Sequence, residues 1–197
     1  MMSIVHNTHV TNRLAIMKPI QRYFELLNRI DTQTKRLTAL HGKALVCRPG
    51  CTSCCRNLSV FPVEFHAIRH AMARAGTDPK TVPFDTSASC GFLNEGLCRI
   101  YPFRPIICRT HGLPILFLDD SSGEYAWEVS FCELNFTGRG DIEFTDDMLL
   151  DIEEINTELS RINRDFIALK EQEKEHPPQR IPLKALCTPS GGKSLCA

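Results

Sequence analysis

The chain has 197 residues, 43% hydrophobic and 23% charged, which is typical of a globular protein with one or two domains. Lysine plus arginine (23) equals aspartate plus glutamate (23), so bulk charge indicates no nucleic-acid partner. No stretch approaches the roughly 18 apolar residues of a membrane span, and the N-terminus lacks a secretory pattern. We therefore expect no membrane association and a cytoplasmic location, where the ten cysteines favour metal ligation or redox chemistry over disulfides.

Residues 1–45 are predicted to form an N-terminal helical segment, with one helix over 13–40. Apolar residues recur there at helical spacing, namely Ile20, Phe24, Leu27, Ile30, Leu37 and Leu40. A shorter helix is predicted over residues 62–75, where Gly76 provides an end. A β-hairpin is predicted from two apolar strands, 113–119 and 124–132.

Residues 141–174 are predicted to form a C-terminal helix that packs on the N-terminal helix. Its apolar seam steps by 4 and 3 through Met148, Ile152, Ile155, Leu159, Ile162, Phe166 and Leu169. Thr145 can cap this helix, and acids at 146 and 147 suit its first turn. Alternatively, the seam over 148–169 binds a protein partner or a second copy of the chain. Residues 175–197 are rich in proline, glycine and lysine and are predicted to be a disordered tail.

Eight of the ten cysteines lie in the segment 46–140, which we interpret as a cysteine-cluster metal-binding domain. The predicted ligands are Cys47, Cys51, Cys54, Cys55, Cys90, Cys98, Cys108 and Cys132. The short spacings between the first four let one tight turn direct several thiolates to a common point, and a bound metal then contributes folding free energy. The expected fold class is mainly α with a cysteine-rich irregular metal-binding region and a small β-hairpin, a small α+β protein.

The adjacent pair Cys54 and Cys55 cannot easily bind one tetrahedral ion together. The pair therefore serves either two different metals or two irons of one cluster, and both alternatives stay open. Arginines flank the cysteines, and Arg104 and Arg109 are the candidates to offset thiolate charge from outside the ligand set.

The segment CRPGCTSCC, the following VEFHAI and the segment CGFLNEGLCRIYPFRPIICR resemble the YkgJ-type cysteine-cluster family, whose motif is CxxCxxCC. The resemblance covers about residues 45–136, and Cys132 in FCELNF fits its last cysteine. It implies a zinc- or iron-chelating domain, with an iron–sulfur cluster or iron as the expected cofactor and zinc as a close alternative. The helices on either side lie outside this resemblance.

Three kinds of function are consistent with these features. The first is a metal-binding protein that acts in metal handling or electron transfer. The second is an enzyme that transfers methyl groups or electrons and uses the cluster as cofactor or scaffold. Its polar candidates would be Glu64, Tyr101, Arg104, Arg109 and His111. The third is a zinc-stabilised interaction module. The sequence does not decide whether the protein is an enzyme.

Overall fold

The computed structural model describes residues 4–121, 123–138, 142–172 and 174–187. The helices are α1 (Ile4–His41), α2 (Pro62–Arg74), α3 (Ile106–Thr110) and α4 (Ile152–Gln172). The strands are β1 (Ser59–Val60), β2 (Leu93–Asn94), β3 (Leu97–Cys98), β4 (Ile115–Asp119), β5 (Ala126–Ser130), β6 (Leu150–Asp151) and β7 (Ile181–Pro182). The predicted fold class is confirmed: helices dominate, and the strands form three small sheets.

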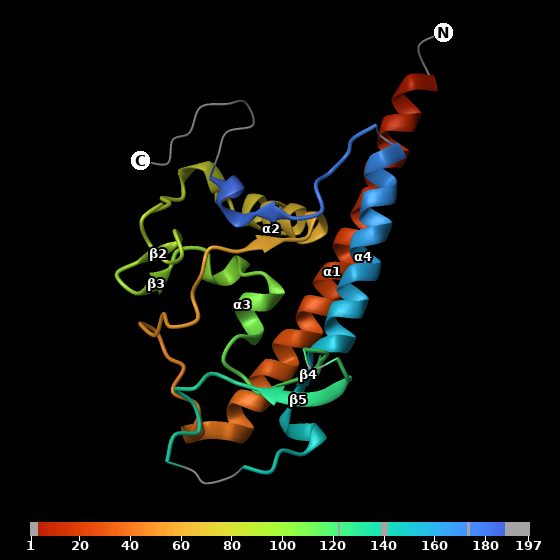
Figure 1. Cartoon of the computed structure of the whole chain (residues 1–197). Coiled ribbons are helices and arrows are strands. Elements are labelled where there is room, and N and C mark those ends of the chain that lie inside the picture. Colours follow the sequence, from red (N-terminus) through yellow and green to blue (C-terminus); the bar gives the residue numbers. More distant parts are fainter. Residues whose placement is uncertain (1–3, 122, 139–141, 173, 188–197) are drawn as a thin grey trace.

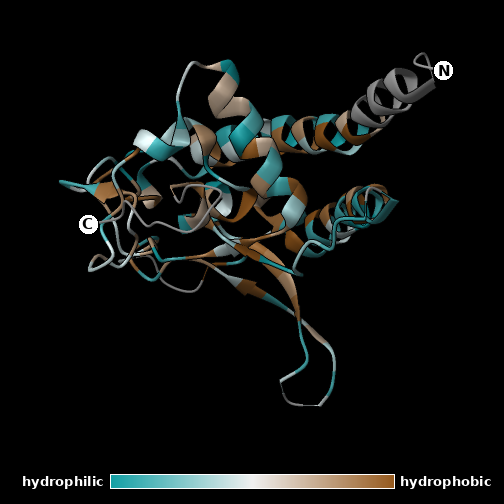
Figure 2. Cartoon of the chain, turned by 90° about the horizontal axis from the view of Figure 1, so that it is seen from above, coloured by the Kyte–Doolittle hydropathy of each residue, from teal (hydrophilic) through white to brown (hydrophobic). Residues whose placement is uncertain are grey.

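The long helices α1 and α4 lie side by side in opposite directions (Figure 1). Ion pairs join Arg22 to Asp165 and Arg29 to Glu158. A step of seven residues towards the C-terminus of α1 therefore matches a step of seven residues towards the N-terminus of α4, as expected for antiparallel helices. Both helices alternate hydrophobic and hydrophilic residues (Figure 2). The buried α4 residues, all from the predicted seam, are Ile155, Leu159, Ile162 and Phe166.

This packing accounts for the apolar seam within the chain, while a protein partner or second copy on the 148–169 helix stays a prediction. The seam residues Ile155, Leu159 and Ile162 belong to the same core cluster as Ile20 and Ile30 of α1. Because burial removes apolar area from water, the seam is stabilised within its own chain. Its buried residues are therefore covered by α1 together with Val63 and Ala67 of α2.

The start of α4 also differs from the prediction. Residues 146–148 form a 3-10 turn, and β6 then pairs in parallel with β4. The backbone is therefore extended through Asp151, and the helix begins only at Ile152. The carboxylate of Asp151 accepts a hydrogen bond from the backbone N–H of Glu154 at 2.9 Å, so Asp151 takes the capping position that the sequence suggested for Thr145.

A second core lies beside α2 and includes the end of the described chain. Strand β7 pairs antiparallel with β1, and Leu183, Leu186 and Cys187 are buried. The prediction of a disordered tail from residue 175 is therefore wrong for residues 181–187, while residues 188–197 lie outside the described residues. Leu183 and Leu186 lie in a short 3-10 turn and belong to the same core cluster as Val60 and Phe65. Their burial orders this part of the tail despite its polar overall composition.

The predicted hairpin is present as β4 and β5, with Leu118 opposite Trp127. Both strands are shorter than predicted, and Trp127 is 58% exposed. Among the described residues, no helix combines the length and apolarity needed to cross a bilayer. The region from 46 to 112 contributes residues to both cores, and it contains seven of the eight predicted ligands.

Candidate metal centre

The eight predicted ligands are all free thiols; Cys47 is exposed and the other seven are half-buried. In the described part of the chain, no three His, Cys, Asp or Glu side chains are already arranged to hold a metal ion. The thiols instead lie in two neighbourhoods, each built by its own hydrogen bonds. Thiolate chemistry fits zinc and iron, because soft sulfur ligands select these metals.

Cys47 and Cys132 meet at Gly112. A methyl group at Gly112, whose φ is +89°, would lie 2.9 Å from the Sγ of Cys47 and 3.8 Å from the Cβ of Cys132. Asn135 is 2% exposed, and its side chain connects the segment before Cys47 with Gly112. Its Oδ1 accepts from the backbone N–H of Val46 at 2.9 Å, and its Nδ2 donates to the Gly112 carbonyl at 2.6 Å. Its Nδ2 also lies 3.7 Å from the Sγ of Cys47.

Cys51 and Cys54 complete what we call the first thiol group, which consists of Cys47, Cys51, Cys54 and Cys132. A turn closed by a 3.0 Å hydrogen bond from the Cys51 N–H to the Arg48 carbonyl brings Cys51 back towards Cys47. Burial raises the pKa of the Cys47 thiol; the contact with Asn135 opposes this, and the charges of Cys132, Cys51 and Cys54 raise it further. Cys47 therefore lies close enough to the other three thiols for their charges to act on it.

The second thiol group consists of Cys55, Cys90, Cys98 and Cys108. The hairpin of β2 and β3 pairs Cys98 with Leu93, whose N–H donates to the Cys90 carbonyl at 3.0 Å. The hairpin therefore carries Cys98, and the turn that leads into it carries Cys90. Cys90 and Cys98 also pack against the second core.

Asn57 attaches the segment of Cys55 to this hairpin. Its backbone N–H donates to the Ser89 carbonyl at 2.8 Å, and its Oδ1 accepts from the Gly91 N–H at 3.0 Å. Both bonds flank Cys90 in the sequence. Asn57 therefore does for the second group what Asn135 does for the first: it joins two distant ligand segments through its side-chain amide.

Cys108 lies in α3 and completes the second group. Burial raises the pKa of Cys108 to about 12, with further increases from Cys90 and Cys98. Burial also raises the pKa of Cys55 to about 11, with Cys54, Cys90 and Cys98 adding to the increase. At neutral pH these thiols are protonated, so a metal must displace their protons on binding.

The two arginines predicted near the centre occupy different positions. Arg104 stacks on Tyr101 at 3.6 Å, donates to the Cys108 carbonyl at 3.2 Å, and its charge lowers the pKa of Cys98 and Cys108 against the effect of burial. Arg109 instead forms a two-oxygen ion pair with Asp31 of α1 at 2.9 and 3.0 Å. It also donates to the Pro102 and Arg104 carbonyls, so its contacts anchor α3 to α1.

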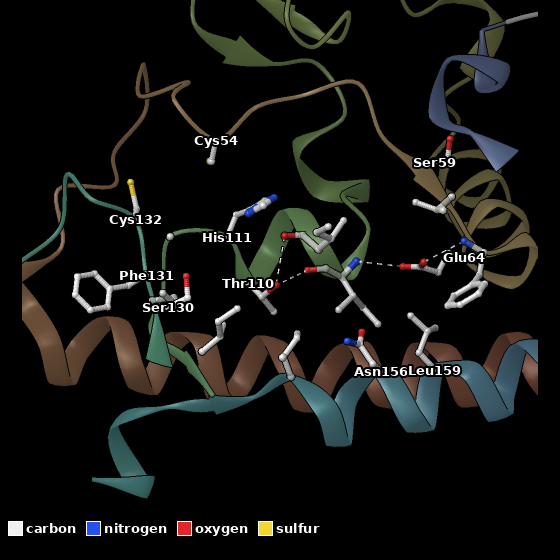
Figure 3. Close-up of a pocket in the computed structure, with 18 of the residues that line it drawn as sticks. Cys54, Ser59, Glu64, Thr110, His111, Ser130, Phe131, Cys132, Asn156 and Leu159 are labelled. Carbon is white, nitrogen blue, oxygen red and sulfur yellow. Dashed lines mark hydrogen bonds between the residues drawn. The ribbon is translucent and has the colours of Figure 1, made fainter. Parts of the chain in front are cut away.

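A cavity of about 610 Å³ opens beside the first thiol group. Cys54, Cys132 and His111 lie around one end, and Ser59 and Glu64 lie at the other (Figure 3). Ile115, Ile152 and Leu159 are among its apolar lining residues. Burial lowers the pKa of His111, so this imidazole is neutral at physiological pH and able to accept a proton or a hydrogen bond.

Glu64, a candidate for catalysis in the sequence, has a structural role. Its carboxylate accepts from the backbone N–H groups of Phe61 and Ile106, both at 3.3 Å, and Tyr23 donates its hydroxyl at 3.4 Å. It therefore satisfies the first turns of two helices. Burial raises the pKa of Glu64, and the three hydrogen bonds act in the opposite direction.

The comparisons with known proteins agree with the cysteine pattern. Residues 46–133 match the family model described as "CxxCxxCC: Putative zinc- or iron-chelating domain", which confirms the resemblance seen in the sequence. This segment is under half of the chain and contains all eight thiols of the two groups. No curated protein and no solved structure matches the chain. The class of protein that the site defines is therefore one with a metal-chelating cysteine domain.

Sequence reasoning missed Gly112, Asn57 and Asn135. Both asparagines follow a predicted ligand closely, Asn57 two residues after Cys55 and Asn135 three residues after Cys132. A short amide near a ligand is a weak signal in the sequence, because its partners lie 34 and 89 residues away.

Proposed function

We propose that this protein binds zinc or iron, the latter as the ion or as an iron–sulfur cluster, and acts in metal handling or electron transfer. The observation that carries the proposal is the gathering of eight free thiols from four separate segments into adjoining neighbourhoods within the family domain. Because these thiols are half-buried or exposed, metal ligation explains their clustering better than packing in an apolar core does. Metal coordination also supplies the folding free energy that a loop-rich segment lacks.

The surroundings of the thiols are consistent with both roles. Four thiolates around a divalent ion leave net negative charge, and Arg104 is placed to offset part of it at the second group. The first group borders a cavity that a small molecule or a metal donor could enter. Handling requires such access, whereas electron transfer requires a stable cluster near a surface.

Purification of the full chain without oxygen tests the proposal. We expect stoichiometric iron with acid-labile sulfide, or stoichiometric zinc, by elemental analysis. A brown protein with charge-transfer absorption indicates a cluster, and a colourless protein with zinc indicates structural or transferable zinc. A folded protein that contains neither metal and takes up neither on reconstitution contradicts the proposal.

The cavity favours an enzyme as the second candidate function. It places the Cys54 and Cys132 thiols and the neutral imidazole of His111 around one open cavity. An enzyme could use a metal on the first group together with His111 as a proton acceptor. Retention of a small molecule by the purified protein, lost in His111→Ala while the metal content stays unchanged, would support this candidate.

A further inference from the structure

The eight thiols divide into two complete sets of four. We propose that the domain holds two metal ions in separate four-thiolate sites, with the boundary between Cys54 and Cys55. This inference rests on the proposed function and deepens it. The first site uses Cys47, Cys51, Cys54 and Cys132, and the second uses Cys55, Cys90, Cys98 and Cys108.

The hydrogen bonds of two asparagines support the division, because each asparagine joins ligand segments of one set. The segments of Cys47 and Cys132 are joined through Asn135 and meet at Gly112. The segments of Cys55 and Cys90 are joined through Asn57, and the β2–β3 hairpin adds Cys98. These two sets of contacts share no residue.

The number of ligands agrees with the division. Zinc in structural sites is almost always four-coordinate, and a cubane iron–sulfur cluster also takes four cysteines. Eight thiols therefore satisfy two centres with none left over.

The two sites meet at the vicinal pair. The Cys54 and Cys55 thiols contact each other. The two loops also touch elsewhere, because a methyl group at Gly96 in the hairpin turn would lie 3.3 Å from the Cα of Gly50. The alternative is therefore one binuclear centre with shared thiolates. We favour separate sites because each set already has four thiolates, so that no sulfur needs to bridge.

Metal titration of the full metal-free chain under reducing, anaerobic conditions tests the division. We expect two equivalents of zinc to bind, and two equivalents of cobalt to give the absorption of tetrahedral four-thiolate cobalt. The double variant Cys47→Ser/Cys132→Ser should bind one equivalent, and so should Cys98→Ser/Cys108→Ser. Cys196→Ser, outside the described residues, is the control and should keep two.

Two results would overturn the division while the proposed function stands. One is a single equivalent of zinc in the unaltered chain. The other is loss of the cobalt electron paramagnetic resonance signal on going from one to two equivalents, because shared thiolates couple the two spins. Absence of any metal binding would instead remove the proposed function.

Alkylation of the unaltered chain provides a readout that does not depend on a variant folding. Mass spectrometry can identify which cysteines zinc protects as it is added. We expect protection to appear in two sets, with the members given above, and the two sets to saturate together at two equivalents. Protection of a set that mixes members, such as Cys47 with Cys98, contradicts the division.

Discussion

The two thiol groups have the same number of ligands and the same kind of amide connector, yet they lie in different surroundings. In the second group, Cys90 and Cys98 pack against the core that also contains Phe92 and Ile100. In the first group, Cys54 and Cys132 line an open cavity. A metal on the second group would hold core elements together, whereas a metal on the first could be reached by another molecule.

We therefore expect a metal on the second group to stabilise the fold and a metal on the first group to be accessible to other molecules. Coordination adds most to stability where ligand segments have few other contacts to hold them and where a core depends on their position. The β2–β3 hairpin has only two residues in each strand, so a metal is its natural support. The segments of the first group are joined by the buried Asn135, which forms hydrogen bonds whether or not a metal is bound.

Complete removal of metal should give the largest loss of stability. We expect the cysteine domain to lose its structure while the pair of helices α1 and α4 keeps most of its own. After treatment with a strong chelator under reducing conditions, we expect protease to cut first between residues 46 and 133. Helical circular dichroism should survive in good part, because α1 and α4 share a buried apolar core. Complete loss of helicity would show that the helices also depend on the metal.

Removal of one ligand from each group should distinguish a stabilising site from an accessible one. We expect Cys98→Ala to lower the free energy of unfolding by several kcal/mol, since a structural metal contributes on the order of 10 kcal/mol when bound. Cys132→Ala should lower it by clearly less. Thermal unfolding of the two metal-loaded variants checks this difference, and equal losses would contradict the comparison.

A substitution at Gly112 should give a smaller effect, confined to the first group. In Gly112→Ala the new methyl group would collide with the Sγ of Cys47, so we expect metal affinity of that group to fall roughly 10- to 100-fold. Gly123→Ala is the matched control, because Gly123 has a similar φ of +84° with no atom within 4 Å of its Cβ position. Both variants carry about 1 kcal/mol of backbone strain.

Competition with a chromophoric chelator measures the affinity in these two variants. Only Gly112→Ala should release one of the two metal equivalents more readily, and the other equivalent should keep its affinity. If Gly123→Ala weakens binding as much, the loss reflects general destabilisation and not the contact with Cys47.

Local patterns in the sequence predicted much of the fold. The seam of α4 and the helix beginning at Pro62 follow from apolar residues at helical spacing, which depends on neighbours within one or two turns. The cysteine spacings likewise identified the metal-binding domain that the family comparison confirms. The predicted strands of the hairpin were correct in type but too long, because pairing extends only from Ile115 opposite Ser130 to Asp119 opposite Ala126.

Contacts between distant segments decided the rest. Residue 181 joins a sheet with residue 60, and β6 pairs with β4 across more than thirty residues, so composition alone misjudged the tail and the start of α4. The same holds for the thiols. The sequence identified Cys54 and Cys55 as a pair that one tetrahedral ion would not share, and left two interpretations open. The division that we propose rests on Asn57 and Asn135, whose hydrogen bonds form only once the chain has folded.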